Sequence, residues 1–143
     1  MKGVKNFMTQ LTPYLSFDGN CAEAMEFYKS CLGGELEINK VGDSPMKDKM
    51  PDKKDWVMHS SLTSGALVLM ASDLMMGGSV TRGNGVTLTI NGATREELKE
   101  YFAKLSVGGK VGQPLQEAFF GMYGDLTDKY GVLWAFQADP VSK

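Results

Sequence analysis

Histidine and cysteine, which supply many metal ligands and nucleophiles in proteins, are scarce in this 143-residue chain: it has one histidine and two cysteines. An excess of charge is also lacking. The 15 basic and 17 acidic residues leave a net charge of −2, which argues against a nucleic-acid partner. The longest apolar run, Ala66–Ala71, is too short to cross a bilayer. The first eight residues lack the apolar core of a signal peptide, so we expect a cytoplasmic protein whose native start is either Met1 or Met8.

The two cysteines lie ten residues apart in one expected helix, at Cys21 and Cys31. At about 100° and 1.5 Å per residue, their side chains are about 80° apart around the helix axis and about 15 Å apart along it. They therefore cannot form a disulfide with each other or share a metal ion. Two unpaired cysteines fit a reducing compartment, and we expect both to be small apolar residues on a packed helix face.

An internal repeat is the clearest pattern in the chain. Asn20 and Thr94, 74 positions apart, each begin a capping-box pattern with a glutamate three residues later. Apolar stripes of helical period follow at the same offset: Ala24, Phe27, Tyr28 and Cys31 in one copy, and Leu98, Tyr101, Phe102 and Leu105 in the other. Gly34 and Gly108 keep the offset and are expected to end the two helices. The sequence thus predicts two equivalent amphipathic helices.

Matching strand-like segments surround the two helices. Leu11–Phe17 and Val86–Ile90 precede them, while Gly65–Asp73 and Gly131–Asp139 end the two halves at an offset of 66. Each half therefore reads as strand, helix, strand, strand, strand. We predict an α+β fold of two βαβββ modules within one domain.

We place the first module at about residues 8–73, a linker at about 74–84 and the second module at about 85–139. The connecting segment is rich in glycine and contains Met75 and Met76. Glycine gives backbone freedom, and methionine gives adaptable apolar surface. The segment is therefore either a plain linker or a flap over a pocket between the modules.

The doubled module resembles the vicinal-oxygen-chelate (glyoxalase/bleomycin-resistance/dioxygenase) superfamily, and its finer match is to the PhnB-like branch. The stretches that carry the resemblance are Thr12–Tyr28, Met58-His59, Met70–Asp73, Phe120-Gly121 and Asp128–Trp134. The resemblance implies a cup-shaped mixed sheet with the helices on its outer face, a cavity inside it, and a homodimer. Proteins of this branch are sometimes labelled 3-demethylubiquinone-9 3-methyltransferase, but this chain has no glycine-rich loop typical of S-adenosylmethionine binding.

Superfamily enzymes typically bind a divalent metal with one residue from the first and one from the last strand of each module. Aligning the motifs and applying the two offsets puts these positions at Pro13, Leu69, Thr87 and Ala135. Imidazole, carboxylate and thiolate donors are missing there. A slip of one residue offers Tyr14, Val68 or Met70, Val86 or Leu88, and Trp134 or Phe136, which are no better. We therefore expect neither a metal at this site nor another cofactor.

The only histidine, His59, lies in the expected strand Trp56–Leu62. A two-residue Ser64-Gly65 turn would put Ser60 beside Leu69 on the cavity side and His59 on the helix side, whereas a three-residue loop would reverse this arrangement. His59 is therefore either a hydrogen-bonded structural residue between sheet and helix, or a neutral base or hydrogen-bond donor to a ligand.

Two aspartates have competing roles. Asp73 ends the last strand of the first module, where it either reaches a cavity mouth as a weak catalytic candidate or, like its repeat mate Asp139, caps a strand end. Asp128 is expected to organise the turn before the last strand, as aspartate does in Asx-turns.

If Pro13 faces the cavity, strand alternation adds Leu15 and Phe17 from the first strand, and Leu133, Ala135 and Gln137 from the last. Trp134 is then expected on the helix side. Such an apolar wall with one amide suits a small hydrophobic or aromatic ligand. We therefore predict a metal-free small-molecule-binding protein. The alternatives are a metal-dependent lyase, isomerase or dioxygenase whose ligands lie elsewhere, and a sequestering protein of the antibiotic-resistance type.

Overall fold

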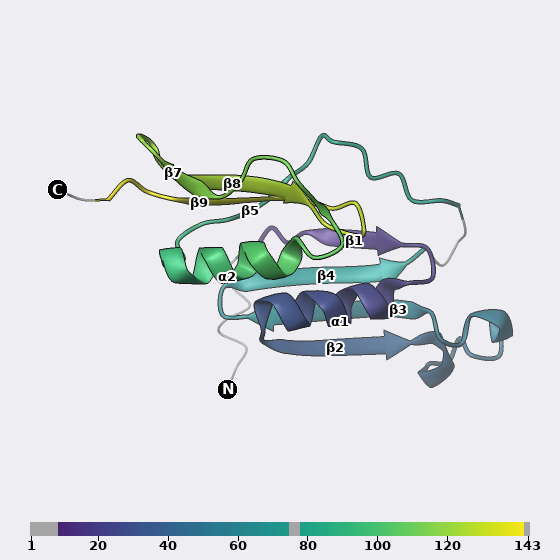
Figure 1. The fold of residues 1–143 in the computed structure, drawn as a ribbon. Coiled ribbons are helices and arrows are strands. Elements are labelled where there is room, and N and C mark those ends of the chain that lie inside the picture. The colour runs from purple at the N-terminus through teal and green to yellow at the C-terminus, as the bar shows by residue number, and fades with distance from the viewer. Residues whose placement is uncertain (1–8, 75–77, 142–143) are drawn as a thin grey trace, which may run out of the picture.

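A computed structural model describes residues 9–74 and 78–141 of the chain (Figure 1). Its elements are β1 (Tyr14–Phe17), α1 (Cys21–Leu32), β2 (Glu35–Lys40), β3 (Val57–Ser64), β4 (Leu67–Asp73), β5 (Leu88–Ile90), α2 (Arg95–Leu105), β6 (Lys110–Val111), β7 (Gln116–Ala118), β8 (Gly121–Thr127) and β9 (Leu133–Ala138), with short 3-10 turns η2 (Val41–Asp43) and η3 (Pro51–Lys53) between β2 and β3. Met8, Met75 and Met76, which entered the predictions above, lie outside the described residues.

The strands form two mixed sheets, as an α+β fold of two βαβββ units requires. The first sheet has the order β1-β4-β3-β2, and the second has the order β5-β9-β8-β6 with β7 also paired to β8. In each sheet the strand before the helix runs parallel to the last strand of its half, and the other pairs are antiparallel. The two helices lie side by side on one face of the molecule and contact each other (Figure 1).

The helix repeat is confirmed at its predicted offset, since α1 and α2 begin at Cys21 and Arg95. The capping boxes are not equivalent, however. Thr94 Oγ1 accepts from the Glu97 backbone N–H at 3.1 Å, and Glu97 Oε1 accepts from the Thr94 backbone N–H at 3.0 Å. Asn20 makes no side-chain cap hydrogen bond, so the capping box expected there was wrong. Asp73 takes over this role, because its Oδ1 accepts from the Cys21 N–H at 3.0 Å.

This difference predicts unequal effects of two matched substitutions. Thr94→Ala removes a working cap and should lower the free energy of unfolding by about 1 kcal/mol. Asn20→Ala removes a side chain that caps nothing, and should change it by less than about 0.5 kcal/mol. Urea unfolding followed by circular dichroism measures both. Equal losses would mean that Asn20 caps α1 in solution.

The β3–β4 hairpin has a two-residue turn, Gly65-Ala66, one position later than the Ser64-Gly65 turn considered above. Ser60 therefore pairs with Ala71, and Leu62 with Leu69. A register shift of two positions preserves which residues share a face. All four of these side chains are buried on the helix side, so the histidine between them in sequence, His59, points to the opposite, open face of the first sheet.

A single apolar core joins the two halves beneath the helices. It includes Leu62 and Leu69 from the first sheet and Trp134 and Phe136 from the second. Trp134 packs on the helix side as predicted, with its ring 5.7 Å from that of Tyr28 on α1. The interior therefore fixes β9 of the second half against α1 of the first.

No helix among the described residues is long and apolar enough to span a membrane.

Candidate functional site

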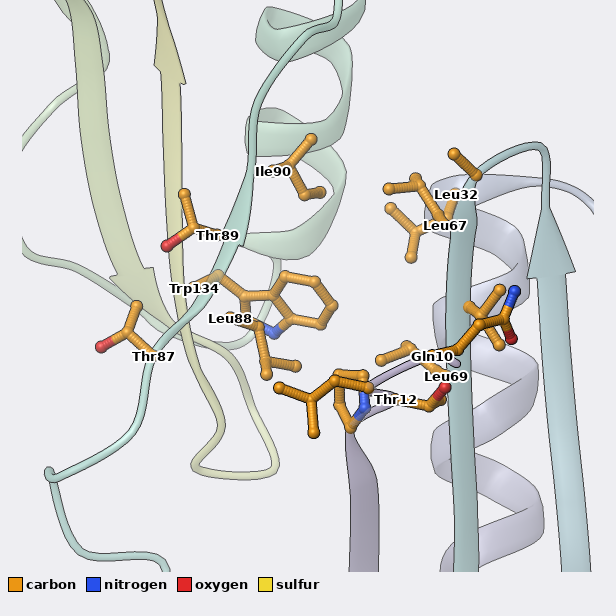
Figure 2. A pocket seen from close by; sticks show the side chains of 14 residues that line it. Gln10, Thr12, Leu32, Leu67, Leu69, Thr87, Leu88, Thr89, Ile90 and Trp134 are labelled. Atoms are coloured by element: carbon orange, nitrogen blue, oxygen red, sulfur yellow. The ribbon is translucent and has the colours of Figure 1, made fainter. Parts of the chain in front are cut away.

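A cleft of about 540 Å³ opens between the two sheets, between β4 and β5 (Figure 2). Its lining is mainly apolar: Leu11, Pro13, Leu32, Ala66, Leu67, Val68, Leu69, Leu88, Ile90 and Trp134, with Gln10, Thr12, Thr87 and Thr89 as the polar contributors. Leu88, Ile90 and Trp134 project into it from the second half, facing Leu32, Leu67 and Leu69 of the first (Figure 2). We call this space the intermodule cleft.

The cleft exists because β1 is short. Its four residues pair only with the second half of β4, from Tyr14 opposite Met70 to Phe17 opposite Asp73. The first half of β4 therefore has no strand beside it on the β1 side, and the chain at Gln10–Pro13 borders the opening instead. Side chains that would be core in a continuous sheet, such as Leu67, are left half-buried.

A buried carboxylate, that of Asp128, accepts a hydrogen bond from the cleft residue Trp134. Asp128, 3% exposed, accepts from Trp134 Nε1 at 2.8 Å and from Tyr28 Oη at 2.6 Å. It also accepts from the backbone N–H groups of Tyr130 and Val132 at 2.8 and 3.1 Å. The turn role predicted for Asp128 is thus present, and the same carboxylate links α1 to the Trp134 indole that lines the cleft.

Three of the nine predicted cavity residues meet in the intermodule cleft: Pro13, Leu69 and Thr87. Leu15 and Leu133 meet in a neighbouring cavity of about 110 Å³. Gln137 lines a different, polar hollow at the end of β9. Ala135 is buried beside Trp134 in β9. The single cavity predicted for these nine residues is thus divided in the structure, which brings three of them together in the cleft.

Phe17 and Ser60 do not reach the cleft. Phe17 is 1% exposed in the core, and Ser60 is fully buried on the helix side, where its Oγ donates to the Ala71 carbonyl at 2.8 Å. Position along the strands explains this, because Ser60 pairs with Ala71 and Phe17 with Asp73, whereas only the first half of β4, Leu67–Leu69, borders the cleft. The predicted pair Leu69 and Ala135 also differ in orientation. Leu69 faces the helices. Trp134 faces the helices too, so Ala135, the next residue in β9, faces the opposite side of its sheet.

The residues do not fit the divalent metal that the superfamily resemblance implies. On the open faces the first and last strands present Tyr14 and Met70 in one half, and Thr89 and Ala135 in the other. A lone phenol, a thioether, a hydroxyl and a methyl group do not make a divalent-metal site. Among residues 9–74 and 78–141, no group of three or more histidine, cysteine or acidic side chains is placed to hold a metal.

His59 lies outside the cleft, on the open face of the first sheet. Its Nδ1 is 3.1 Å from Tyr14 Oη in a hydrogen bond, and the two rings are 5.8 Å apart. Tyr14 is 50% exposed, so the pair faces solvent. The placement between sheet and helix considered for His59 is therefore wrong.

The placement of Asp73 at a cavity mouth is also wrong. Asp73 is 1% exposed, and within the part of the chain that the structure describes its carboxylate accepts from three backbone N–H groups, those of Gly19, Cys21 and Val57.

Neither cysteine is suited to nucleophilic catalysis. Both thiols are buried, as predicted. Burial raises the pKa of Cys21 to about 12 and also raises the pKa of Cys31. A thiol with a raised pKa stays protonated at neutral pH and reacts slowly. The intermodule cleft therefore offers apolar surface and a few hydroxyl and amide groups, which is the chemistry of a binding site.

Sequence reasoning missed the other eleven of the fourteen residues that line the cleft, among them Leu67, Leu88 and Trp134, the last of which was expected on the helix side. The signal that could have found Trp134 is the Asp-x-x-Gly-x-x-Trp pattern itself. An aspartate six residues before a tryptophan across a turn is positioned to hold the indole N–H, and Asp128 does so.

Comparison with known proteins gives the family. The model of the 3-demethylubiquinone-9 3-methyltransferase family matches residues 9–137. The chain belongs to this PhnB-like family. Protein YjdN of Escherichia coli K12 is 32% identical over 136 residues, which span 87% of this chain and 91% of YjdN.

Solved structures agree with this assignment. Protein PA1353 from Pseudomonas aeruginosa superposes with a TM-score of 0.80 at 36% identity, covering 92% of this chain and 98% of its own. The PhnB protein from Bacillus cereus, a putative 3-demethylubiquinone-9 3-methyltransferase, gives 0.73 at 30% identity, covering 91% and 99%. A glyoxalase/bleomycin resistance protein from Albidiferax ferrireducens shares the fold, with a TM-score of 0.64 at 18% identity over 92% of this chain and 100% of that one. The vicinal-oxygen-chelate fold of this PhnB-like protein is thus established.

Proposed function

We propose that this PhnB-like protein binds a small hydrophobic or aromatic molecule in the intermodule cleft without using a metal. The observation that carries the proposal is a cleft of about 540 Å³ whose walls are leucine, isoleucine, proline and tryptophan. This volume lies within the range of about 300–1,000 Å³ for small-molecule sites, which are mostly apolar with a few polar groups that fix orientation.

Both halves supply walls of this cleft, which supports treating the chain as one domain. We further propose that the protein acts as a homodimer in the cytoplasm. The dimer rests on the family resemblance, and the compartment rests on two buried cysteines that are both free.

Two alternatives remain distinct. A metal-dependent enzyme of the same superfamily requires ligands that the described residues do not bring together. A sequestering protein of the resistance type requires tight binding of a flat aromatic compound without turnover, and the name of the Albidiferax relative includes bleomycin resistance. Elemental analysis of the purified protein distinguishes the metal-dependent enzyme from a metal-free binding protein. A stoichiometric transition metal would overturn the proposal of metal-free binding. Unchanged recovery of a tightly bound aromatic compound after incubation would favour sequestration.

Butylbenzene, an aromatic hydrocarbon without a polar group, tests the site directly. We expect it to raise the melting temperature and to change the fluorescence of Trp134, because the indole lines the cleft. Leu67→Ser, which makes the wall polar, should weaken butylbenzene binding about tenfold, in line with loss of part of a buried leucine contact.

Val107→Ser is the matched control, because Val107 is 62% exposed and lies outside the cleft. It should leave butylbenzene binding unchanged. Failure of butylbenzene to change either signal would contradict the proposal, and so would equal weakening by the two serine variants.

A further inference from the structure

A second, polar pocket lies against the same strand as the intermodule cleft. It has a volume of about 430 Å³ and is lined by Thr87, Lys110, Tyr123, Asp125 and Thr127, among others. Tyr123, Asp125 and Thr127 alternate along β8, so their side chains share one face of the second sheet. Asp125 pairs with Ala135, which places this face on the side of β9 opposite to Trp134. We call it the polar pocket.

Two of the polar groups of this pocket, the Tyr123 phenol and the Asp125 carboxylate, are already committed to each other. Tyr123 Oη donates to Asp125 Oδ2 at 2.9 Å, and the Gln113 backbone N–H donates to Asp125 Oδ1 at 2.8 Å. The hydrogen bond to Asp125 raises the pKa of Tyr123, so the phenol keeps its proton at neutral pH. Both carboxylate oxygens therefore have a donor, and the Tyr123 proton is not available to a ligand.

Lys110 is the cationic residue of this pocket. The ion pairs among the described residues join Arg95 to Glu117 and Lys104 to Glu100, and neither involves Lys110. Lys110 pairs across the sheet with Thr127, whose side chain belongs to the same face as Asp125. Within residues 9–74 and 78–141 its ammonium therefore has no ionic partner, and it lies at a pocket whose other charged group, Asp125, already accepts from Tyr123 and Gln113. Such a site is complementary to an anion that accepts hydrogen bonds.

The polar pocket and the intermodule cleft are neighbours, because Thr87 and Trp134 line both. Thr87 lies just before β5, a strand of three residues. Figure 2 shows Leu88 pointing into the cleft while Thr87 points to the other side of the chain. One molecule that crosses the chain near Thr87 would thus contact apolar walls at one end and polar groups at the other.

We propose that the ligand is an amphipathic carboxylic acid. Its apolar or aromatic body lies in the intermodule cleft, and its carboxylate lies in the polar pocket near the Lys110 ammonium and the hydroxyls of Thr87 and Thr127. The proposal rests on the proposed function and names its ligand class.

Three probes with one body and different ends test it: 4-phenylbutyrate, 4-phenylbutan-1-ol and butylbenzene, measured by isothermal titration calorimetry. We expect 4-phenylbutyrate to bind most tightly. Lys110→Gln should weaken 4-phenylbutyrate by about two- to fivefold, the usual worth of an exposed ion pair, and leave butylbenzene unchanged. The advantage of the acid should also shrink as salt is added.

Lys29→Gln is the matched control, because Lys29 is an exposed lysine on α1 outside both pockets. It should leave all three affinities unchanged. Equal affinity of the acid and the hydrocarbon would overturn the carboxylate proposal while leaving the apolar cleft in place, and so would equal weakening by Lys110→Gln and Lys29→Gln. If none of the three probes binds, the proposed function fails, and this inference fails with it.

Discussion

Asp128→Ala is expected to lower the free energy of unfolding by about 3–5 kcal/mol, the usual cost of removing one partner from a buried charged network. Four donors lose their acceptor at once, and two of them, Tyr28 Oη and Trp134 Nε1, are buried side-chain groups. Burial and the Asp128 carboxylate together raise the pKa of Tyr28 above its ordinary value. The substitution should therefore also lower the pH at which Tyr28 ionises. Urea unfolding and ultraviolet titration of the tyrosines measure the two effects.

Tyr28→Phe is the control for this prediction. It removes a single hydrogen bond to Asp128 and leaves the carboxylate its other three donors, so it should cost only about 1–2 kcal/mol. A loss of less than about 1 kcal/mol for Asp128→Ala would show that the link between α1 and the second half contributes little to folding.

The helices could be predicted closely from the sequence, and the reason is geometric. A 3.6-residue period with a cap and a glycine stop tolerates an error of one residue at either end, so the offset from Asn20 to Thr94 located both helices. Strand predictions tolerate less error, because an alignment error of one residue assigns every side chain to the wrong face of the sheet. The same offsets therefore put Leu69 and Ala135 on equivalent positions, whereas their side chains face opposite sides of their sheets.

The sequence predicted the chemical type of the candidate site but not its position in the fold. Apolar walls and missing metal donors follow from residue types at Pro13, Leu69 and Thr87, and these three do line the intermodule cleft. The position of the cleft depends on where β1 stops pairing with β4, and propensity does not specify the length of a four-residue strand. The polar pocket was missed because Lys110, Tyr123 and Asp125 meet only through the β6–β8 pairing and the path of the chain before β5.

Asp73→Ala should destabilise the protein about as much as Asp128→Ala, by about 3–5 kcal/mol, because it also leaves buried donors without an acceptor. The donors here are backbone N–H groups from three places in the first half: Gly19, Cys21 at the start of α1, and Val57 at the start of β3. Their distances to the carboxylate are 2.8, 3.0 and 2.8 Å. Asp73, at the end of β4, thus connects this strand to the start of α1 and to the start of β3. The side chain of Asn20 makes no cap hydrogen bond to α1. Chemical unfolding measured by circular dichroism tests the prediction.

Two variants separate this role from a general effect of removing charge. Asp73→Asn keeps one oxygen for Gly19 and Cys21 but turns an N–H group toward the Val57 donor, so it should cost less than the alanine, about 1–3 kcal/mol. Asp139→Ala removes the exposed repeat mate and should cost less than about 0.5 kcal/mol. Similar losses for Asp73→Ala and Asp139→Ala would mean that the carboxylate acts through net charge, not through the three N–H groups it accepts.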